Sequence, residues 1–501
     1  MGFENHMCML PDSRHACFDG FTSHPLHLDI MTYSNQPRPA DLNALADVTL
    51  SPFWLDDPAR PEAGAPLAGA HEADLVVIGA GFTGLWTALL AREADPTREV
   101  ILLEAHRVAS GASGRNGGFC SASLTHSFEN GVNRWPADMP ALLRMGFENL
   151  DGIEATVRRY GIDCDFTRSG ELTAALNADE AEEFMREAGR AARYGKTFTF
   201  LDREQTRARV NSPLYQAGIV DPDDAMLNPA RLAWGLRRAC LGLGVRLFEG
   251  SPVQRLEATR NEVIVHTRQG RVRARRVALA TNAFPPLLKH LSLYMVPVYD
   301  YVLMTEPLTP GQRESIGWRG REGLGDSANQ FHYSQITADG RILWGGYDAI
   351  YYWNNGIKPE LENRPETFAR LAGHFFQTFP QLEGLRFTHA WGGVIDTCSR
   401  FTAFWGNSLG GKLAYVLGYT GLGVGASRFG AQVMLDRLDG RATERTALAM
   451  TRTRPLPFPP EPFRSPIINV TRWSLDRADQ NGGRRNLWLK LLDALGLGYD
   501  S

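Results

Sequence analysis

Three glycines with fixed spacing are the first residues in this chain that could carry chemistry. Gly79, Gly81 and Gly84 form a G-x-G-x-x-G set between an apolar run and a helical pattern. In a dinucleotide-binding turn, the first glycine permits the tight turn, the second lets the backbone approach a pyrophosphate, and the third lets the helix pack close to the strand. Phe82 and Thr83 would begin that helix, whose free N–H groups and partial positive charge favour phosphates.

An acidic residue follows at the end of the next apolar run. Glu104 closes the segment VILLE, twenty residues after Gly84. A carboxylate at this position can accept hydrogen bonds from both ribose hydroxyls of an adenosine, and its charge would repel a 2′-phosphate. The alternative is a structural glycine turn without a ligand, which the order of strand, turn, helix and acidic residue disfavours. The pattern predicts FAD or NAD.

A polar loop directly after Glu104 distinguishes these two cofactors. The segment ASGASGRNGGFCSAS, residues 109–123, contains many small residues and one cation, Arg115. Such a loop offers backbone donors to the second half of a long dinucleotide and to a flavin ring, which an NAD domain does not need. The alternative is a flexible surface loop. The loop therefore favours FAD. No second G-x-G-x-x-G follows a strand, so we expect no separate NAD(P)H domain and expect electrons to enter from the substrate.

The elements that would position these residues form a strand–helix–strand unit. The run Leu75–Ile78 predicts a buried strand before the glycine turn, and VILLE predicts a second one after the helix. Asn177 is a predicted helix cap, and Pro229 is a predicted first-turn residue. Further helices are predicted over 138–160, 178–195, 228–244, 365–379 and 486–495, and strands over VRLFEGSPVQRLEAT, NEVIVHT and RVRARRVALAT.

Composition limits the class of protein. With 501 residues, 43% of them hydrophobic and 22% charged, the chain predicts two or more globular domains. A net charge of −3 gives no electrostatic footprint for nucleic acid, and no stretch approaches about 20 apolar residues, so no membrane span is expected. Six cysteines without a C-x-x-C pair predict no metal centre. The first thirty residues contain no signal-peptide core, and we expect a soluble cytoplasmic protein.

Longer segments around these motifs resemble a known superfamily. HEADLVVIGAGFTGLWTALLARE, LLEAHRVASGASGRNGG and GYTGLGVGASRFGAQVMLDRLDG are similar to the D-amino-acid oxidase, glycine oxidase and sarcosine oxidase superfamily. ASGRNGG and WGGVIDTCSRF are most similar to its gamma-glutamylputrescine oxidoreductase branch. The resemblance covers about residues 70–440 and implies an α/β fold. A discontinuous Rossmann-like FAD-binding domain (71–130, 200–285 and 385–440) would carry an inserted β-sheet-based α+β substrate domain (131–199 and 286–384). Residues 1–70 would be an N-terminal extension and 441–501 a C-terminal one.

The resemblance also implies a set of cofactor-binding residues. It places the pyrophosphate at the glycine turn and the adenosine ribose at Glu104. Non-covalently bound FAD would further contact the loop, the strand ends and the turn before the last helix of the domain, at Ser113, Arg115, Asn116, Gly117, Gly118, Val253, Thr281, Gly421, Gly423 and Val424.

Three departures from the family pattern are informative. In RILWGGYD, Trp344 stands where sarcosine-type oxidases have a lysine credited with activating dioxygen. Leu422 stands where the branch often has histidine, and Gln335 where arginine is usual. All three remove a polar or charged group, so we expect a pocket less suited to a simple amino-acid carboxylate and a slow reaction with dioxygen.

Other candidate residues have simpler interpretations. Cys398 could attach the flavin covalently, but its spacing from Gly418 is shorter than in covalent relatives, so a buried, inert thiol is expected. His332 and His389 are expected to be structural. The clustered aromatics would be largely core, with an aromatic cage for an amine as the minority alternative: Tyr299, Tyr301, Tyr347, Tyr351, Tyr352 and Trp353.

These observations predict an FAD-dependent oxidoreductase acting on the C–N bond of a small amine or amino acid. Hydride transfer to the flavin from a carbon beside a neutral amine, followed by imine hydrolysis, needs little acid–base catalysis. The candidates for direct participation are Arg115, Trp344 and Tyr347. Dioxygen is one electron acceptor, and a dehydrogenase that uses another acceptor is the alternative. A flavin-binding protein with little turnover is the alternative from a different class.

Overall fold

A computed structural model describes residues 33–481 and 483–495 of the chain. Its first sheet has the strand order β18-β19-β11-β1-β2-β8, and β1, β2, β8, β11 and β19 are parallel. A hairpin of β9 and β10 continues from β11. The bounds are β1 Gly69–Ile78, β2 Val100–Leu103, β8 Arg246–Phe248, β9 Arg255–Ala258, β10 Val263–His266, β11 Gly270–Leu279, β18 Phe404–Ser408 and β19 Leu413–Leu417.

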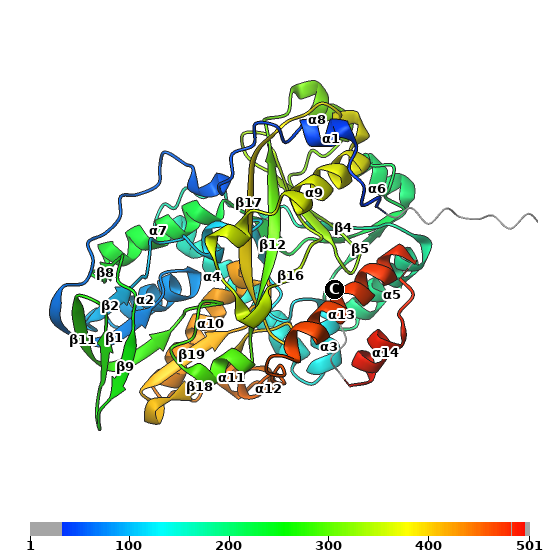
Figure 1. Ribbon diagram of the computed structural model, residues 1–501. Coiled ribbons are helices and arrows are strands. Elements are labelled where there is room, and N and C mark those ends of the chain that lie inside the picture. The colour runs from blue at the N-terminus through cyan, green and yellow to red at the C-terminus, as the bar shows by residue number, and fades with distance from the viewer. Residues whose placement is uncertain (1–32, 482, 496–501) are drawn as a thin grey trace, which may run out of the picture. The chain divides into compact units, whose positions relative to one another are not determined.

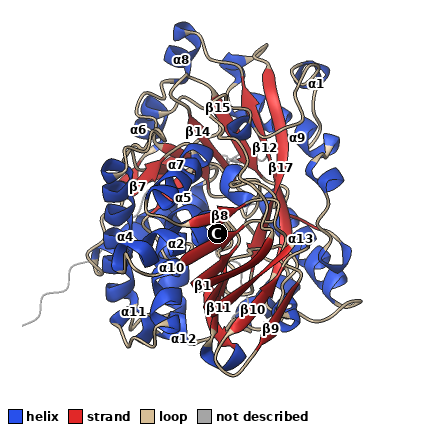
Figure 2. Ribbon diagram, turned by 90° about the vertical axis from the view of Figure 1, so that its left-hand side faces the viewer, coloured by secondary structure: helices blue, strands red, loops and turns tan. Residues whose placement is uncertain are grey.

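The run Leu75–Ile78 is continuously apolar because both faces of this sheet are covered. Leu75 and Val77 belong to one hydrophobic cluster with helices α2, α4, α7 and α10, whereas Val76 and Ile78 belong to another cluster on the opposite face. Figure 2 shows these helices gathered along one side of the strands. Their bounds are α2 Phe82–Ala94, α4 Met139–Arg159, α7 Pro229–Gly242 and α10 Gly423–Leu438.

A second sheet has the order β16-β12-β15-β14-β13-β4-β6-β5, with β17 paired along the other edge of β12 (Figure 1). Its bounds are β4 Glu171–Ala175, β5 Thr199–Leu201, β6 Ala217–Asp221, β12 Val296–Thr305, β13 Gly323–Asp326, β14 His332–Ile336, β15 Ile342–Gly346, β16 Ile350–Tyr351 and β17 Phe387–Thr397. Helix α9, Pro365–Thr378, covers one face. Alternation along β12 places Tyr299, Tyr301 and Leu303 against α9, and Asp300 on the other face.

Most of the predicted elements occur with small changes at their ends. Asn177 caps α5 (Ala178–Ala192) by accepting from the Glu180 N–H at 3.0 Å, and Pro229 is the first residue of α7. The segment predicted as one strand over VRLFEGSPVQRLEAT is two strands, β8 and β9, which pair with different neighbours. Glycine and proline at its centre break the extended run, because proline cannot donate to a sheet ladder.

The sheet membership of the strands differs from the predicted division at two places. β6 and β17 lie in segments expected in the FAD domain, yet both pair into the second sheet. Conversely, α4 was expected in the substrate domain but packs against α10 of the first. Strand pairing and helix packing between segments far apart in the chain decide to which sheet each element belongs, and local sequence patterns do not predict these contacts.

Shorter elements and terminal segments complete the described chain. The predicted N-terminal extension is described only from residue 33 onward, and there Trp54 is buried and donates from Nε1 to the Asn116 carbonyl at 2.9 Å. The C-terminal segment folds into α13, Arg464–Gln480, and α14, Leu487–Ala494. The remaining bounds are α1 Pro39–Asn43, α3 Phe128–Arg134, α6 Arg203–Arg209, α8 Pro310–Ile316, α11 Glu444–Ala447, α12 Ala449–Arg452, β3 Phe119–Ser121 and β7 Asp224–Met226.

Candidate active site

A cavity of about 1650 Å³ connects the glycine turn of the first sheet with the polar face of the second. Typical sites for small molecules and cofactors are about 300–1,000 Å³. This cavity therefore has room for a long dinucleotide and for a second ligand.

The glycine turn has the geometry that its spacing predicts. Gly79 adopts a φ of +99°, and a Cβ there would lie 2.4 Å from the Ala280 carbonyl oxygen. A Cβ at Gly84 would lie 1.8 Å from the Gly79 oxygen, so the helix can approach the strand only with glycine at this position. A Cβ at Gly81 would lie 2.9 Å from Ser113 Oγ. The turn therefore opens a backbone-lined space at the N-terminus of α2, where phosphates are favoured.

Glu104 lies in the cavity at the carboxyl end of β2, and the backbone holds its carboxylate. The Ala80 N–H donates to Oε2 at 2.8 Å, and the His106 N–H donates to Oε1 at 2.9 Å. Burial raises the pKa of Glu104, against the lowering effect of these two hydrogen bonds. A carboxylate offers about four lone-pair sites. Two sites remain for hydroxyl donors, as an adenosine ribose requires.

The polar loop after Glu104 connects the two sheets. The Phe82 N–H, in the first turn of α2, donates to Ser113 Oγ at 2.9 Å. Asn116 Oδ1 accepts from the Gly118 N–H at 2.8 Å, which fixes the turn. The Tyr333 ring lies over Gly117, where a Cβ would be only 2.6 Å from it. The loop predicted to contact the flavin thus packs directly against the cavity face of the second sheet.

Most of the predicted cofactor residues line this one cavity, although they come from distant parts of the chain. They are Gly79, Gly81, Phe82, Thr83, Glu104, Ser113, Arg115, Asn116, Gly117, Val253, Thr281, Gly421, Gly423 and Val424. Gly84 and Gly118 are not among the lining residues: Gly84 serves the approach of helix to strand, and a Cβ at Gly118 would meet the Leu227 oxygen at 2.2 Å. Which of the lining residues touch FAD stays a prediction.

The arginine in the loop is not a free cation. Arg115 pairs with Glu362 Oε2 at 2.6 Å and donates to the carbonyls of Gly392, at 3.0 Å, and Ser110, at 2.8 Å. It lines the cavity, but its charge is compensated. The hydrogen bond to the Gly392 carbonyl ties the loop to β17 of the second sheet.

Trp344 does not face the cavity, which corrects the expectation that it stands over the flavin. It is 1% exposed and stacks on His332, with ring centroids 4.8 Å apart, on the α9 side of the sheet. Its neighbour Gly345 lies on the side occupied by the Tyr333 ring. The register of β15 decides this, because successive strand residues point to opposite faces.

Gln335 also lies outside the cavity lining, and its side chain is engaged elsewhere. Its Nε2 donates to the carbonyls of Gly117 and Leu227. Tyr347 lines the cavity, and its hydroxyl donates to Asp476 of α13 at 3.3 Å. Of the six aromatic residues considered for an aromatic cage, all of them in the part of the chain that the structure describes, only Tyr347 lines this cavity. The aromatic cage is therefore not formed by that set.

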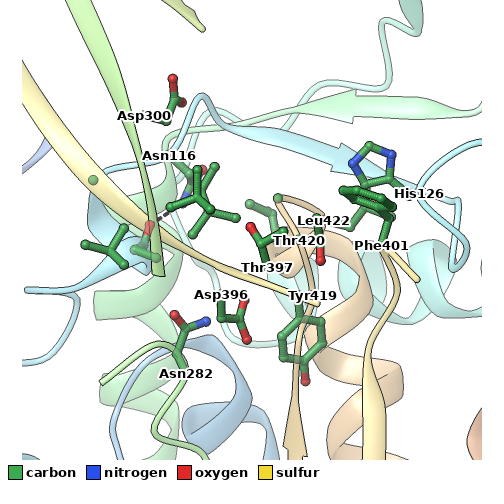
Figure 3. A pocket seen from close by; sticks show the side chains of 18 of the residues that line it. Asn116, His126, Asn282, Asp300, Asp396, Thr397, Phe401, Tyr419, Thr420 and Leu422 are labelled. Atoms are coloured by element: carbon green, nitrogen blue, oxygen red, sulfur yellow. Dashed lines mark hydrogen bonds between the residues drawn. The ribbon is translucent and has the colours of Figure 1, made fainter. Parts of the chain in front are cut away.

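Several polar residues of the cavity were not singled out in the sequence. Asp300 of β12 accepts a hydrogen bond from the Tyr333 hydroxyl, and burial raises its pKa to about 6. Asp396, at the end of β17, accepts from the Gly418 N–H at 2.6 Å, and burial raises its pKa to about 7. Figure 3 shows Asn282 beside Asp396, with Asp300 beyond Asn116 on the other side of the cavity.

Backbone strain also concentrates at this cavity. His126, Asn282, Tyr347, Phe401 and Thr420 all have positive φ, between 50° and 73°, and all line it. Such conformations cost energy in residues with a side chain and gather at functional sites. Burial lowers the pKa of His126 to about 4, so its imidazole is neutral. Neither the φ angles nor the pKa shifts could be predicted from the local sequence, because both result from contacts between segments far apart in the chain.

The two singled-out histidines have the structural surroundings expected of them, whereas Cys398 lines the cavity and its inertness stays a prediction. The Cys398 thiol is buried and donates to the Thr402 carbonyl at 3.1 Å, and burial raises its pKa. His332 lies within hydrogen-bonding distance of Asp326, at 2.7 Å, and of His374, at 2.9 Å. His389 lies 3.2 Å from Asp56. Across the described residues, no group of three or more His, Cys, Asp or Glu is arranged to hold a metal ion, and no helix is long and apolar enough to cross a membrane.

The fold and the cavity together define an oxidoreductase-type architecture, in which a nucleotide-binding sheet faces a substrate sheet. The backbone cradle at the glycine turn, the two free acceptor sites of Glu104 and the cavity volume fit FAD.

Comparison with known proteins gives the family. Residues 74–437 match the model of the DAO family, described as FAD dependent oxidoreductase. Gamma-glutamylputrescine oxidoreductase of Escherichia coli is 30% identical over 389 residues, covering 77% of this chain and 88% of that protein. The probable oxidoreductase OrdL of Haemophilus influenzae is 29% identical over 388 residues, covering 75% and 85%.

Solved structures share the fold at low sequence identity. Glycine oxidase from Geobacillus kaustophilus has a TM-score of 0.63 at 17% identity, over 76% of this chain and 99% of that one. L-proline dehydrogenase from P. horikoshii has a TM-score of 0.63 at 18% identity, over 77% and 96%. The chain belongs to the DAO family of FAD-dependent oxidoreductases and acts on amines or amino acids. Its cofactor is FAD, held non-covalently, as is typical of the family.

Proposed function

We propose that this protein oxidises the C–N bond next to the primary amine of an extended amine, with γ-glutamylputrescine as the first candidate substrate. The cavity carries the proposal. It continues from the FAD cradle to the second sheet, and carboxyl groups outnumber cations in its lining: Glu104, Glu171, Glu187, Asp221, Asp224, Asp300, Asp326, Asp348, Glu362 and Asp396 against Arg107, Arg115, Lys196, Lys358 and Arg472. Some of these carboxylates are paired, such as Asp348 with Arg370 at 2.7 Å, and the others offer acceptors to the N–H groups of an ammonium. The named relative acts on an amine of this kind.

Asp300 is the group best placed to prepare the amine. An alkyl ammonium has a pKa near that of lysine, about 10, and must lose a proton before its carbon can give up a hydride. Asp300 faces the cavity next to the loop of Gly117, and its pKa of about 6 leaves it ionised but basic at neutral pH. It accepts the ammonium proton while the Tyr333 hydroxyl orients the carboxylate.

Asp396 has a positioning role. Both the Gly418 N–H and the Tyr419 backbone bond to its carboxylate, and the Asn282 side chain adds a third partner. These bonds hold the turn before α10, whose N-terminus faces the cavity at Gly421, Gly423 and Val424. A helix N-terminus favours negative charge nearby.

FAD, when bound, supplies the acceptor for the hydride, and the resulting imine hydrolyses in water. The chain's own contribution is to orient the substrate, to exclude bulk water and to hold the proton at Asp300. The final electron acceptor is dioxygen or another oxidant such as a quinone. With Trp344 turned away from the cavity, the missing lysine no longer distinguishes between them.

The test begins with anaerobic reduction of the purified yellow protein. We expect γ-glutamylputrescine to bleach the flavin faster than glycine, sarcosine or D-amino acids do. Admission of air or of a soluble quinone then identifies the better acceptor. An amine panel that leaves the flavin oxidised would refute the proposed function.

The role of Asp300 is tested by Asp300→Asn, with the exposed Asp339→Asn as the matched control. We expect kcat/KM of the wild type to rise with pH through about 6 and the Asn variant to be about 10²-fold slower at pH 7. The deficit should vanish near pH 10, where the free amine is already neutral. A deficit that is constant across pH would contradict proton transfer to Asp300.

A further inference from the structure

The C-terminal segment beyond the family match forms part of the cavity wall. The family model matches residues 74–437, and the lining also includes residues after this match: Leu456, Pro457, Phe458, Pro459, Ile467, Ile468, Thr471, Arg472, Leu475 and Leu492. Helix α13 supplies the central group of these residues (Figure 1). This part of the wall lies outside the residues that the family model matches.

Helix α13 is fixed against the second sheet by its carboxylates. Asp479 accepts from the backbone N–H groups of Asn329, at 2.9 Å, and Gln330, at 3.0 Å. Asp476 accepts from Tyr347, a cavity residue, at 3.3 Å. The helix is thereby held in a definite register, and the side chains one turn earlier point into the cavity.

Arg472 lies one turn, about 6 Å of helix axis, before Asp476. It lines the cavity and is only partly exposed, and its Nε is buried without a hydrogen-bond partner among the described residues. The i+4 carboxylate that would normally pair with it is occupied, because Asp476 accepts from Tyr347 and from Gln480, at 3.1 Å.

The other basic residues of the cavity are accounted for. Arg115 pairs with Glu362, and Lys196 pairs with Asp221 at 2.7 Å. Arg107 donates to the Pro61 carbonyl, and Lys358 is exposed. Within the described parts of the chain, Arg472 is thus the partly buried cavity arginine that makes no hydrogen bond or ion pair through its side chain.

We infer that Arg472 binds a carboxylate on the substrate, remote from the amine that is oxidised. An unpaired, partly buried guanidinium is costly unless a ligand pairs with it, and its planar fork of donors matches a carboxylate with two parallel hydrogen bonds. The inference rests on the proposed function and narrows its substrate class to amines that carry a distant carboxylate. The carboxyl groups of the lining bind the amine, and Arg472 binds the carboxylate at the other end of the substrate.

The experiment compares two substrates that differ only in this group: γ-glutamylputrescine and its α-carboxamide. Arg472→Gln should lower kcat/KM for the carboxylate by about 10- to 100-fold, mainly through KM, and leave the carboxamide unchanged. Arg472→Lys should restore part of the loss, since it keeps the charge but not the fork. Arg477→Gln, an exposed position on the same helix, is the matched control and should change neither.

Direct binding separates this inference from the reaction itself. N-butylglutaramate has the carboxylate but no amine, so it cannot be oxidised. We expect it to bind the wild-type holoenzyme in calorimetry and to bind Arg472→Gln at least tenfold more weakly, even if no amine proves to be a substrate. Equal binding by both proteins, or equal loss of kcat/KM for both substrates, would overturn the assignment.

Discussion

Replacing Glu104 tests the link between the glycine turn and FAD most directly. Its carboxylate accepts the Ala80 N–H at 2.8 Å and the His106 N–H at 2.9 Å and presents its remaining lone pairs to the cavity. Hydrogen bonds to a charged group contribute about 1.5–3 kcal/mol. Losing the ribose contacts in Glu104→Ala should therefore raise the Kd of FAD by roughly 10- to 100-fold.

The same substitution affects the protein without FAD, and the two effects must be measured separately. Glu104→Ala leaves two backbone N–H groups without their acceptor, which costs about 1–3 kcal/mol for each group that water cannot reach. Glu104→Gln keeps the shape but places an amide NH2 where one oxygen accepted an N–H, so it should also weaken FAD binding, to a level that the titration still measures. Glu99→Gln, at the exposed opposite end of β2, is the matched control.

The assay is a fluorescence titration of FAD into apoprotein, alongside the free energy of unfolding of each apo variant. Because burial raises the pKa of Glu104, protonation removes an acceptor as the pH falls through that raised value. FAD affinity should then weaken at acidic pH in the wild type, and this pH dependence should be absent in Glu104→Gln. A Kd for Glu104→Ala within twofold of the wild type would refute the placement of the adenosine.

Two other substitutions test the geometry of the two sheets. Gly84→Ala should lower the free energy of unfolding by more than about 3 kcal/mol, because its Cβ would lie 1.8 Å from the Gly79 oxygen. Gly189→Ala, the control in α5, has open space around its Cβ and should raise the free energy of unfolding by up to about 1 kcal/mol. Urea unfolding of both variants decides this. Trp344→Lys should lower stability by several kcal/mol without faster reoxidation by air, since the side chain faces the α9 core; a stopped-flow acceleration would show that this position does reach the flavin.

Several features of this protein are determined by sequence alone. The close approach at Gly84, the hydrogen bond of Glu104 to Ala80 and the helix cap at Asn177 each involve residues within about twenty-five positions of one another, so local sterics and hydrogen bonding specify them. Likewise, the continuous apolar run of β1 identifies a strand buried on both faces.

Only the tertiary structure decided which side chains face the cavity and which of them have a shifted pKa. The register of β15 turns Trp344 into the core, although its place in the motif suggested the flavin. Asp300 acquires its raised pKa only when β12, β14 and the loop of Gly117 surround it. Arg472 lines the cavity because Asp479 and Asp476 fix α13 beside the second sheet, and Asp476, its i+4 neighbour, bonds to Tyr347 and Gln480. In each case, burial and pairing depend on contacts between segments far apart in the chain, and the free energy of those contacts appears only in the folded molecule.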